Sequence, residues 1–440
     1  MTEKEHCPRP LRDGPAQAAR DRRCDVTDPD AQVALSAARE RRGGPAGAAV
    51  IFMSAAAALG TSTIYVLQPS VAQVAGSLGS RIAEVGLALA LGPIGYMIGL
   101  AVLVPLVDRY PPNQVMAVQF AVLGTALGFS ALVRGIPSLG ALAAVTGAFS
   151  VVGAGMSSIA GRLAQPHRRA TTLGIVTSGI SAGILSGRIV GGLLTDHFGW
   201  RGMLWMFAAG CAVCALCCLL VLPNARNAAT GGLFNSLRSL PGLFVRYRVL
   251  RLAALRGALW FFGFCTVWAG LAAALSQPPF TYSPERIGVY GLAGLSGIAA
   301  TQIAGRSTDR IGARKVILVG LLLASTAALA SSFTLHSVIA TLACLALFDA
   351  GLFAAQVANQ STVLAIDPTA PARYNSGYMV VYFIGGSLGT ALGPTVVTRF
   401  GWSAATLAAT AAFLAATALT LANRPDQTPS ANPVTGHQRV

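Results

Sequence analysis

The sequence predicts an all-α integral membrane protein with twelve transmembrane helices in two pseudo-symmetric six-helix halves. Three observations predict this class. The 440 residues are 54% hydrophobic and only 11% charged, whereas soluble domains carry about 25% charged residues. Apolar runs recur along the chain, each near the roughly 20 residues that cross a bilayer as a helix. Several short motifs also recur about 202 residues apart, which indicates two copies of one half-fold.

The chain opens on a polar segment, residues 1–46, with nine basic and eight acidic residues and no apolar periodicity. We expect a disordered cytoplasmic tail, without the layout of a signal peptide. Twelve predicted spans follow: 47–69, 83–107, 113–133, 138–160, 171–195, 202–222, 252–276, 286–305, 314–334, 337–364, 375–398 and 402–422.

The spans divide into an N-terminal half, 47–222, and a C-terminal half, 252–422. A central cytoplasmic loop, 223–251, is expected to join them, and a second cytoplasmic tail, 423–440, to end the chain. Each apolar run must be helical, because unpaired backbone groups cannot face lipid.

The repeat is carried by three motifs. Phe198-Gly199-Trp200 recurs as Phe400-Gly401-Trp402, and the turn at Asp108-Arg109 recurs at Asp309-Arg310. Glycines spaced by four residues also recur, a spacing that lets two helices approach closely. They are Gly179, Gly183, Gly187 and Gly191 in the first half, and Gly385, Gly389 and Gly393 in the second.

Basic residues predict the orientation. One set of alternate loops holds fifteen lysines and arginines, and the other set holds five. The first set is therefore expected to be cytoplasmic, with both termini on that side of the cytoplasmic (inner) membrane. This asymmetry also explains the net charge of +16 without a nucleic-acid partner.

The chain from about 47 to 422 resembles the major facilitator superfamily. The most specific match is Gly305-x-x-x-Asp309-Arg310-x-Gly312-x-Arg314-Lys315, which is similar to the superfamily signature between helices 8 and 9. The resemblance implies that Gly305, Asp309, Arg310 and Arg314 gate the inner side.

We expect Asp309 to lie just past helix 8, to cap helix 9 and to pair with arginine, as a latch between the halves. A static loop ion pair is the alternative. The first-half copy, Asp108-Arg109, is expected to gate as well, although Val104 stands where the signature has glycine.

Asp349 is the residue most strongly indicated as functional. Of the eight acidic residues in 47–440, it alone lies near the middle of a span. A carboxylate there costs about 2.5–3.5 kcal/mol on the insertion scale, so it must face protein or water. Gln356, Asn359 and Gln360 follow near the same helix face and predict a polar cavity lining. A proton-carrying role stays open, and a structural aspartate is the alternative.

Arg188 is the matching cation, within the glycine-spaced helix 5. It can bind an anionic substrate, neutralise Asp349 across the cavity, or extend to the outer surface. The glycine run resembles the helix 5 motif of superfamily exporters, but arginine stands where that motif usually has proline.

The resemblance also implies that helices 1, 4, 7 and 10 line the cavity, which makes Tyr65, Trp260 and Trp268 candidate ligand contacts. Interfacial or lipid-facing aromatics are the alternative. Gln68-Pro69 and Gln277-Pro278 predict helix breaks. Around Asp349 and along 359–386 the chain also looks like an exporter-like branch of unassigned substrate.

We therefore predict a secondary transporter of a small organic molecule, with export the favoured direction and proton coupling left open. An uptake permease, a membrane sensor and a membrane enzyme are the alternatives. We expect a monomer in the lipid bilayer, with no cofactor and no metal. The four cysteines at 211–218 are read as small apolar helix residues rather than as metal ligands.

Overall fold

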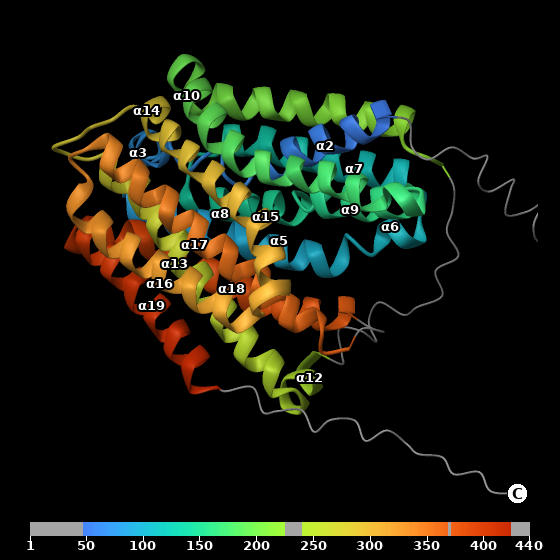
Figure 1. Cartoon of the computed structure of the whole chain (residues 1–440). Coiled ribbons are helices and arrows are strands. Elements are labelled where there is room, and N and C mark those ends of the chain that lie inside the picture. Colours follow the sequence, from blue (N-terminus) through green and yellow to red (C-terminus); the bar gives the residue numbers. More distant parts are fainter. Residues whose placement is uncertain (1–46, 225–239, 368–370, 424–440) are drawn as a thin grey trace, which may run out of the picture. The chain divides into compact units, whose positions relative to one another are not determined.

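The computed structural model describes residues 47–224, 240–367 and 371–423. These residues form α-helices and two short 3-10 helices, with no strand among them. Figure 1 colours the first half blue to green and the second half yellow to red. The predicted tail 1–46, much of the predicted central loop and residues 424–440 lie outside the described residues.

The first half begins with a short helix and ends with the longest one. Its elements are α2 (Gly47–Ser62), α3 (Val71–Ser77), α4 (Ile82–Leu89), α5 (Leu91–Val102), α6 (Leu106–Arg109), α7 (Pro112–Leu132), α8 (Ile136–Phe149), α9 (Val152–Leu163), η1 (Pro166–Arg168) and α10 (Arg169–Val221). Two predicted spans, 171–195 and 202–222, both fall within α10.

The second half has longer, less interrupted helices. Its elements are α12 (Leu240–Arg246), α13 (Arg248–Leu275), α14 (Pro284–Val289), η2 (Tyr290–Ala293), α15 (Gly294–Ile311), α16 (Ala313–Thr334), α17 (Val338–Leu364), α18 (Pro371–Phe400) and α19 (Trp402–Ala422). The described part of the predicted loop 223–251 contains α12, whose Leu243 is buried, and the first turn of α13. Its cytoplasmic location stays a prediction.

Ten of the described helical segments are long and apolar enough to cross a membrane. One of them, Thr171–Val221, is 51 residues long and covers two predicted spans. The first predicted span corresponds to Gly47–Ser62, which is apolar but shorter, with 16 residues. The all-helical membrane class is confirmed, but the count of twelve spans is not fully confirmed.

The repeated Phe-Gly-Trp motif marks the same helix junction in both halves. Gly199 has φ 70° and ψ 161° inside α10, and Gly401 has φ 83° and ψ 173° between α18 and α19. A residue with a Cβ rarely adopts this backbone conformation. Trp200 and Trp402 are both buried, and their indole N–H groups donate to Ser77 Oγ (3.0 Å) and to Ser331 O (2.7 Å). The motif thus ends one helix and anchors the next.

The glycines at four-residue spacing pack α10 on α2 and α18 on α13. A Cβ added at any of them would lie 2.6 Å or less from a backbone carbonyl oxygen of the facing segment. The pairs are Gly179 with Ser54, Gly183 with Ala58, Gly187 with Ser62, Gly191 with Val66, Gly385 with Ala258, Gly389 with Phe262 and Gly393 with Thr266. Only glycine permits backbones this close, and both halves use the same register.

The first transmembrane segment is helical for only part of its length. After Ser62 the chain runs through turns until α3 begins at Val71. Thr63 and Val66 within this stretch are buried, which is where non-helical backbone is tolerated at membrane depth. The predicted break at Gln68-Pro69 is therefore present, but it begins several residues earlier than expected.

Contacts between the halves gather at the end of the molecule that holds Asp196 and Glu285. The Glu285 backbone N–H donates to Asp196 Oδ2 at 3.0 Å, which joins α14 to α10. In addition, Ser387 Oγ of α18 donates to the Ala90 carbonyl at 2.6 Å. At the opposite end, α6 packs on α7 and α9, and α12 packs on α13 and α18, each within its own half.

Candidate functional site

An arginine from the first half and an aspartate from the second half meet around one tryptophan. Trp268 of α13 donates its indole N–H to Asp349 Oδ1 of α17 at 3.2 Å. The Arg188 guanidinium of α10 lies over the same ring, with Cζ 4.2 Å from the ring centroid. All three side chains are buried, with exposed fractions of 3% for Arg188, 1% for Asp349 and 4% for Trp268. Three residues singled out by the sequence are thus brought together.

Arg188 is oriented by the non-helical part of the first span. Its Nε donates to Gln68 Oε1 at 2.9 Å, and Cζ lies 4.9 Å from the Tyr65 ring centroid. Its Nη2 is buried and has no hydrogen-bond partner among the described residues. Burial also means that, in this conformation, the side chain does not extend to the outer surface.

A cavity of about 160 Å³ lies between the halves next to this cluster. Its lining comes from both halves and includes Thr61, Tyr65, Gln68, Tyr96, Trp260, Phe264, Cys265, Phe353, Tyr382 and Thr390. A smaller hollow of about 20 Å³, lined by Arg188 and Asp349, shares Ile184, Phe264 and Phe353 with it. The charged groups therefore lie directly beside the cavity.

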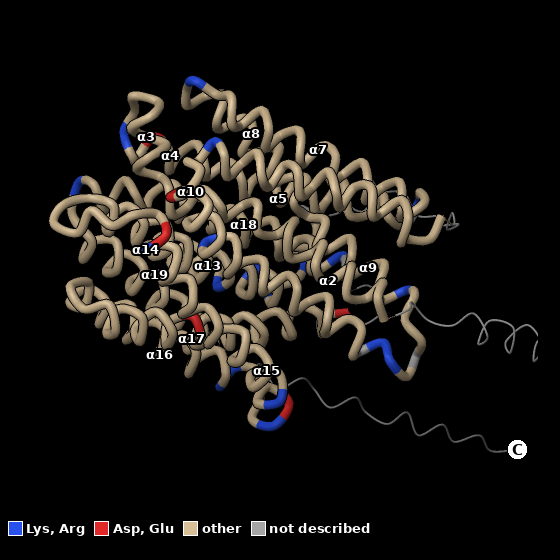
Figure 2. The backbone as a smooth tube through the Cα atoms, turned by 90° about the horizontal axis from the view of Figure 1, so that it is seen from above, with Lys and Arg blue, Asp and Glu red and all other residues tan. Residues whose placement is uncertain are grey.

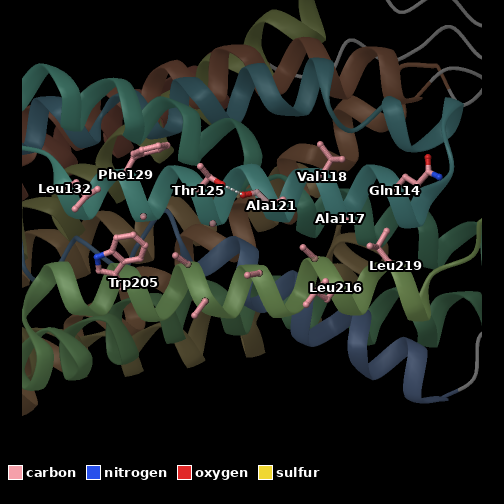
Figure 3. Close-up of a pocket in the computed structure, with 16 residues that line it drawn as sticks. Gln114, Ala117, Val118, Ala121, Thr125, Phe129, Leu132, Trp205, Leu216 and Leu219 are labelled. Atoms are coloured by element: carbon pink, nitrogen blue, oxygen red, sulfur yellow. Dashed lines mark hydrogen bonds between the residues drawn. The ribbon is translucent and has the colours of Figure 1, made fainter.

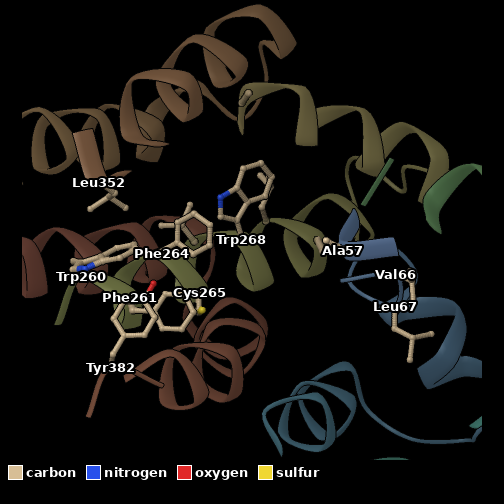
Figure 4. Packing of buried hydrophobic residues seen from close by; sticks show 14 of the residues in the cluster. Ala57, Val66, Leu67, Trp260, Phe261, Phe264, Cys265, Trp268, Leu352 and Tyr382 are labelled. Atoms are coloured by element: carbon tan, nitrogen blue, oxygen red, sulfur yellow. The ribbon is translucent and has the colours of Figure 1, made fainter. Parts of the chain in front are cut away.

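Aromatic side chains build the second-half wall. Figure 4 shows Trp260, Phe264 and Trp268 along α13, with Tyr382 beside Phe261. The rings of Phe261 and Tyr382 stack with centroids 4.1 Å apart and planes 11° from parallel. Such a wall accepts a flat or apolar molecule, because aromatic faces pack well against other rings.

The predicted polar stripe on α17 forms a hydrogen-bonded network within the second half. Gln356 Oε1 accepts from Trp260 Nε1 at 2.8 Å and from the Tyr378 hydroxyl at 2.6 Å. Asn359 Oδ1 accepts from Arg256 Nε at 3.1 Å. Gln360 Nε2 donates to Asn375 Oδ1 at 2.9 Å.

The sequence reasoning missed Arg256 and Tyr378 as members of this network. The charge pattern groups Arg256 with the basic residues of the preceding loop, although it falls inside the predicted span 252–276. Arg256 lies two turns into α13 and one turn before Trp260. Its place inside a predicted span could have identified it as a member of the network.

The turn after α15 differs from expectation in one respect. Asp309 lies in the last turn of α15, not beyond it, and α16 starts at the N-cap Gly312 (φ 88°) without a side-chain cap. The predicted capping role of Asp309 is therefore wrong, because glycine already occupies the cap position. Arg314 donates to the carbonyls of Thr420 and Leu421, at 3.3 and 3.2 Å.

Asp309 and Arg310 are exposed, and Asp309 makes no ion pair with another described residue in this conformation. Figure 2 shows charges of both signs clustered at this end of α15. For the first-half copy, the side chain of Asp108 lies outside the described residues, while Arg109 ends α6. The gating role of both turns stays a prediction.

A larger hollow lies elsewhere, between α7 and the second part of α10. It measures about 1090 Å³ and is lined by residues such as Phe129, Trp205 and Leu216 (Figure 3). None of its lining residues is charged, and Phe129 and Trp205 are 58% and 51% exposed. This open, uncharged and apolar groove fits a lipid-facing surface, so the enclosed cavity between the halves is the candidate functional site.

Buried charges from two repeated halves, beside a cavity at their interface, define a polytopic membrane transporter. The model of the Major Facilitator Superfamily matches residues 50–300 and 280–439. The chain belongs to this superfamily, whose members are transporters and generally not enzymes.

Individual relatives agree with this membership. The chain is 30% identical over 361 residues to the uncharacterized transporter YgaY of Escherichia coli O157:H7, covering 82% of this chain and 92% of that protein. It is 30% identical over 375 residues to the probable transporter SCO4007 of Streptomyces coelicolor, covering 83% and 86%. A solved structure of a mutant of the nucleoside transporter NupG superposes with a TM-score of 0.71 at 13% identity, covering 85% and 99%. This last likeness shows the fold alone.

Proposed function

We propose that this protein is a monomeric secondary transporter that moves a small organic molecule across the cytoplasmic membrane by alternating access. The observation that carries the proposal is the cluster of Arg188, Trp268 and Asp349. It joins the two halves at a cavity, and buried charge of this kind is expensive unless water or cargo reaches it.

The contacts between the halves support a two-state cycle. They gather at the end that holds Asp196 and Glu285, which the arginine pattern predicts to be the outer end. In this conformation the outer side would be closed. Rocking of the halves would break these contacts and bring the turns after α6 and α15 together, where Asp108 and Asp309 would latch the inner side.

Distances between spin labels would test this cycle without knowledge of the substrate. In a variant whose eight cysteines are replaced, one label pair at Gln73 and Glu285 would report the outer end. A second pair at Arg168 and Arg306 would report the inner end. Two populations are expected, with the outer distance long when the inner distance is short.

Substituting Asp196 with alanine removes the acceptor of the Glu285 N–H and should enlarge the outer-open population. One invariant distance at both ends, even in this variant, would contradict alternating access. Deleting residues 1–40 should leave transport intact, whereas a sensor that signals through its tail would lose its response.

Export is the direction that the sequence resemblance favours, and Asp349 is the candidate proton carrier. Inside-out and right-side-out vesicles would separate the directions, because an exporter accumulates substrate only in the former when the driving gradient is imposed. Collapse of the proton gradient should stop accumulation if protons are coupled. Accumulation in right-side-out vesicles would instead indicate an uptake permease.

A further inference from the structure

The cation beside the cavity has a hydrogen-bond donor without a partner among the described residues. Among the described residues, neither Arg188 nor Asp349 forms an ion pair with the other or with any third residue. The Arg188 Nη2 group is buried and makes no hydrogen bond. A buried donor on a charged group is costly when unmatched, so this group points to a ligand that completes it.

We infer that the substrate carries a carboxylate, or an anionic group of similar shape, attached to a compact apolar or aromatic body. The inference rests on the proposed transport function and names the class of molecule for that same site. Arg188 would bind the carboxylate through Nη2, while its Nε stays bonded to Gln68. Guanidinium groups match carboxylates in shape and charge.

A second unmatched polar group lines the larger cavity, beside the hollow that Arg188 lines. Thr61 Oγ1 is buried and has no hydrogen-bond partner among the described residues, and Thr61 lines the 160 Å³ cavity. A hydroxyl can donate to a carboxylate oxygen. At about 30 Å³ for each water molecule in the liquid, a cavity of about 160 Å³ holds roughly five waters, which suits a molecule of about one ring. The rings of Tyr65, Trp260 and Phe264 would enclose that ring.

The hydrogen bonding of the two charged groups favours an anion over a cation, because the Asp349 carboxylate has a donor and the Arg188 Nη2 group has no acceptor among the described residues. Asp349 already accepts the Trp268 N–H, and the Arg188 guanidinium lies over the same indole ring. A cationic ligand at Asp349 would therefore meet a fixed positive charge. Arg256, half-buried on α13 and bonded to Asn359 through Nε, adds a second cation one turn before Trp260.

Matched ligand sets on the purified full-length protein would test the inference. Benzoate, benzamide and benzylamine share one ring and differ in charge, and hexanoate, hexanamide and hexylamine form a second set. Dissociation constants would be measured by tryptophan fluorescence, with thermal unfolding as an independent readout. We expect at least one carboxylate to bind about tenfold more tightly than its amide, and the amines to bind weakest.

Variants of Arg188 and Asp349 would show which side chain causes the preference for carboxylate over amide. Arg188→Gln should abolish the difference between carboxylate and amide, and Arg188→Lys should retain part of it, which separates lost charge from lost folding. Asp349→Asn keeps an acceptor for Trp268 but removes the competing negative charge, so it should tighten carboxylate binding. The inference is overturned if no carboxylate is preferred, if the preference survives Arg188→Gln, or if amines bind best and lose binding in Asp349→Asn.

Failure of the inference and failure of the transport function are distinguishable. If carboxylates bind at Arg188 but never cross proteoliposome membranes, the anion site stands and the transport proposal fails. If neutral or cationic compounds are transported, transport stands and the anion inference fails.

Discussion

The two glycine-lined helix pairs share the same backbone packing but carry different side chains at the position next to the cavity. In the first half, α10 packs on α2, and in the second half α18 packs on α13, with carbonyl oxygens meeting glycines in the same register. The position of Arg188 in α10 corresponds, 202 residues on, to Thr390 in α18. The hydroxyl of Thr390 donates to Gly386 O within its own helix at 2.9 Å, whereas Arg188 donates to Gln68 in the non-helical part of the first span. The repeated glycines thus set the spacing between the backbones, whereas the charged side chain at the candidate site is one that the repeat does not share.

The largest expected effect comes from substituting these two equivalent positions. Arg188→Gln should lower transport of a carboxylate by about 100-fold, since a lost interaction with a buried charge costs on the order of 3 kcal/mol. Thr390→Val should change it by no more than about twofold. Uptake into proteoliposomes, normalised to inserted protein, would measure both. Equal losses of transport in the two variants would mean that Arg188 and Thr390 contribute alike, so that the two helix pairs do not differ in function.

The glycines should respond alike in both halves. Gly183→Ala and Gly389→Ala each place a Cβ against a facing carbonyl, and overpacking of this kind typically costs about 1–3 kcal/mol. Gly174→Ala and Gly377→Ala are matched controls on the same two helices, because a Cβ there meets nothing closer than 3.5 Å. Thermal unfolding in detergent would compare the four variants. If the control variants lose as much stability as Gly183→Ala and Gly389→Ala, the close backbone packing shared by the two halves would be contradicted.

The two tryptophans of α13 should differ in their effect on ligand binding. Trp268→Phe removes a donor to the Asp349 carboxylate, where hydrogen bonds contribute about 1.5–3 kcal/mol. The freed carboxylate would compete with an anionic ligand for Arg188, so binding should weaken by about tenfold. Trp260→Phe removes a donor to the neutral Gln356 amide, where the contribution is about 1 kcal/mol. Titrations of the two variants with the same ligand would rank them. A larger loss for Trp260 would move the centre of the site toward Gln356.

The smallest effect on stability is expected at the repeated turns. Asp309→Asn removes an exposed charge without a described ion pair, so the free energy of unfolding should change by no more than about 0.5 kcal/mol. If Asp309 latches the other conformation, transport should nevertheless slow several-fold. Asp108→Asn is the first-half counterpart. Unchanged rates in both variants would remove the latch from the mechanism.

The membrane class was predictable from the sequence, and the sequence also singled out two of the three side chains that meet at the candidate site. A lone acid at half-depth and an arginine within a glycine run are visible as exceptions to composition, so Asp349 and Arg188 could be found without a structure. That Trp268 lies between them could not, because the contact depends on how α10, α13 and α17 approach one another.

Local backbone geometry was harder to predict than the site. The early end of α2 at Ser62 and the helix α12 both involve apolar residues whose hydropathy does not distinguish helix from turn. The cap of α16 was misassigned to Asp309 for a similar reason. A carboxylate before a helix is a common cap, but Gly312, at φ 88°, places the chain reversal three residues later.

The irregular stretch between Ser62 and Val71 constrains how the protein can move. Peptide groups without helical partners cannot be exposed to acyl chains at any stage of a working cycle. The α2 segment must therefore travel with α10, to which it is joined by the glycine–carbonyl pairs and by the Gln68–Arg188 hydrogen bond. In the transport cycle proposed above, we therefore expect these two helices to move together as one rigid unit, with the pivot elsewhere.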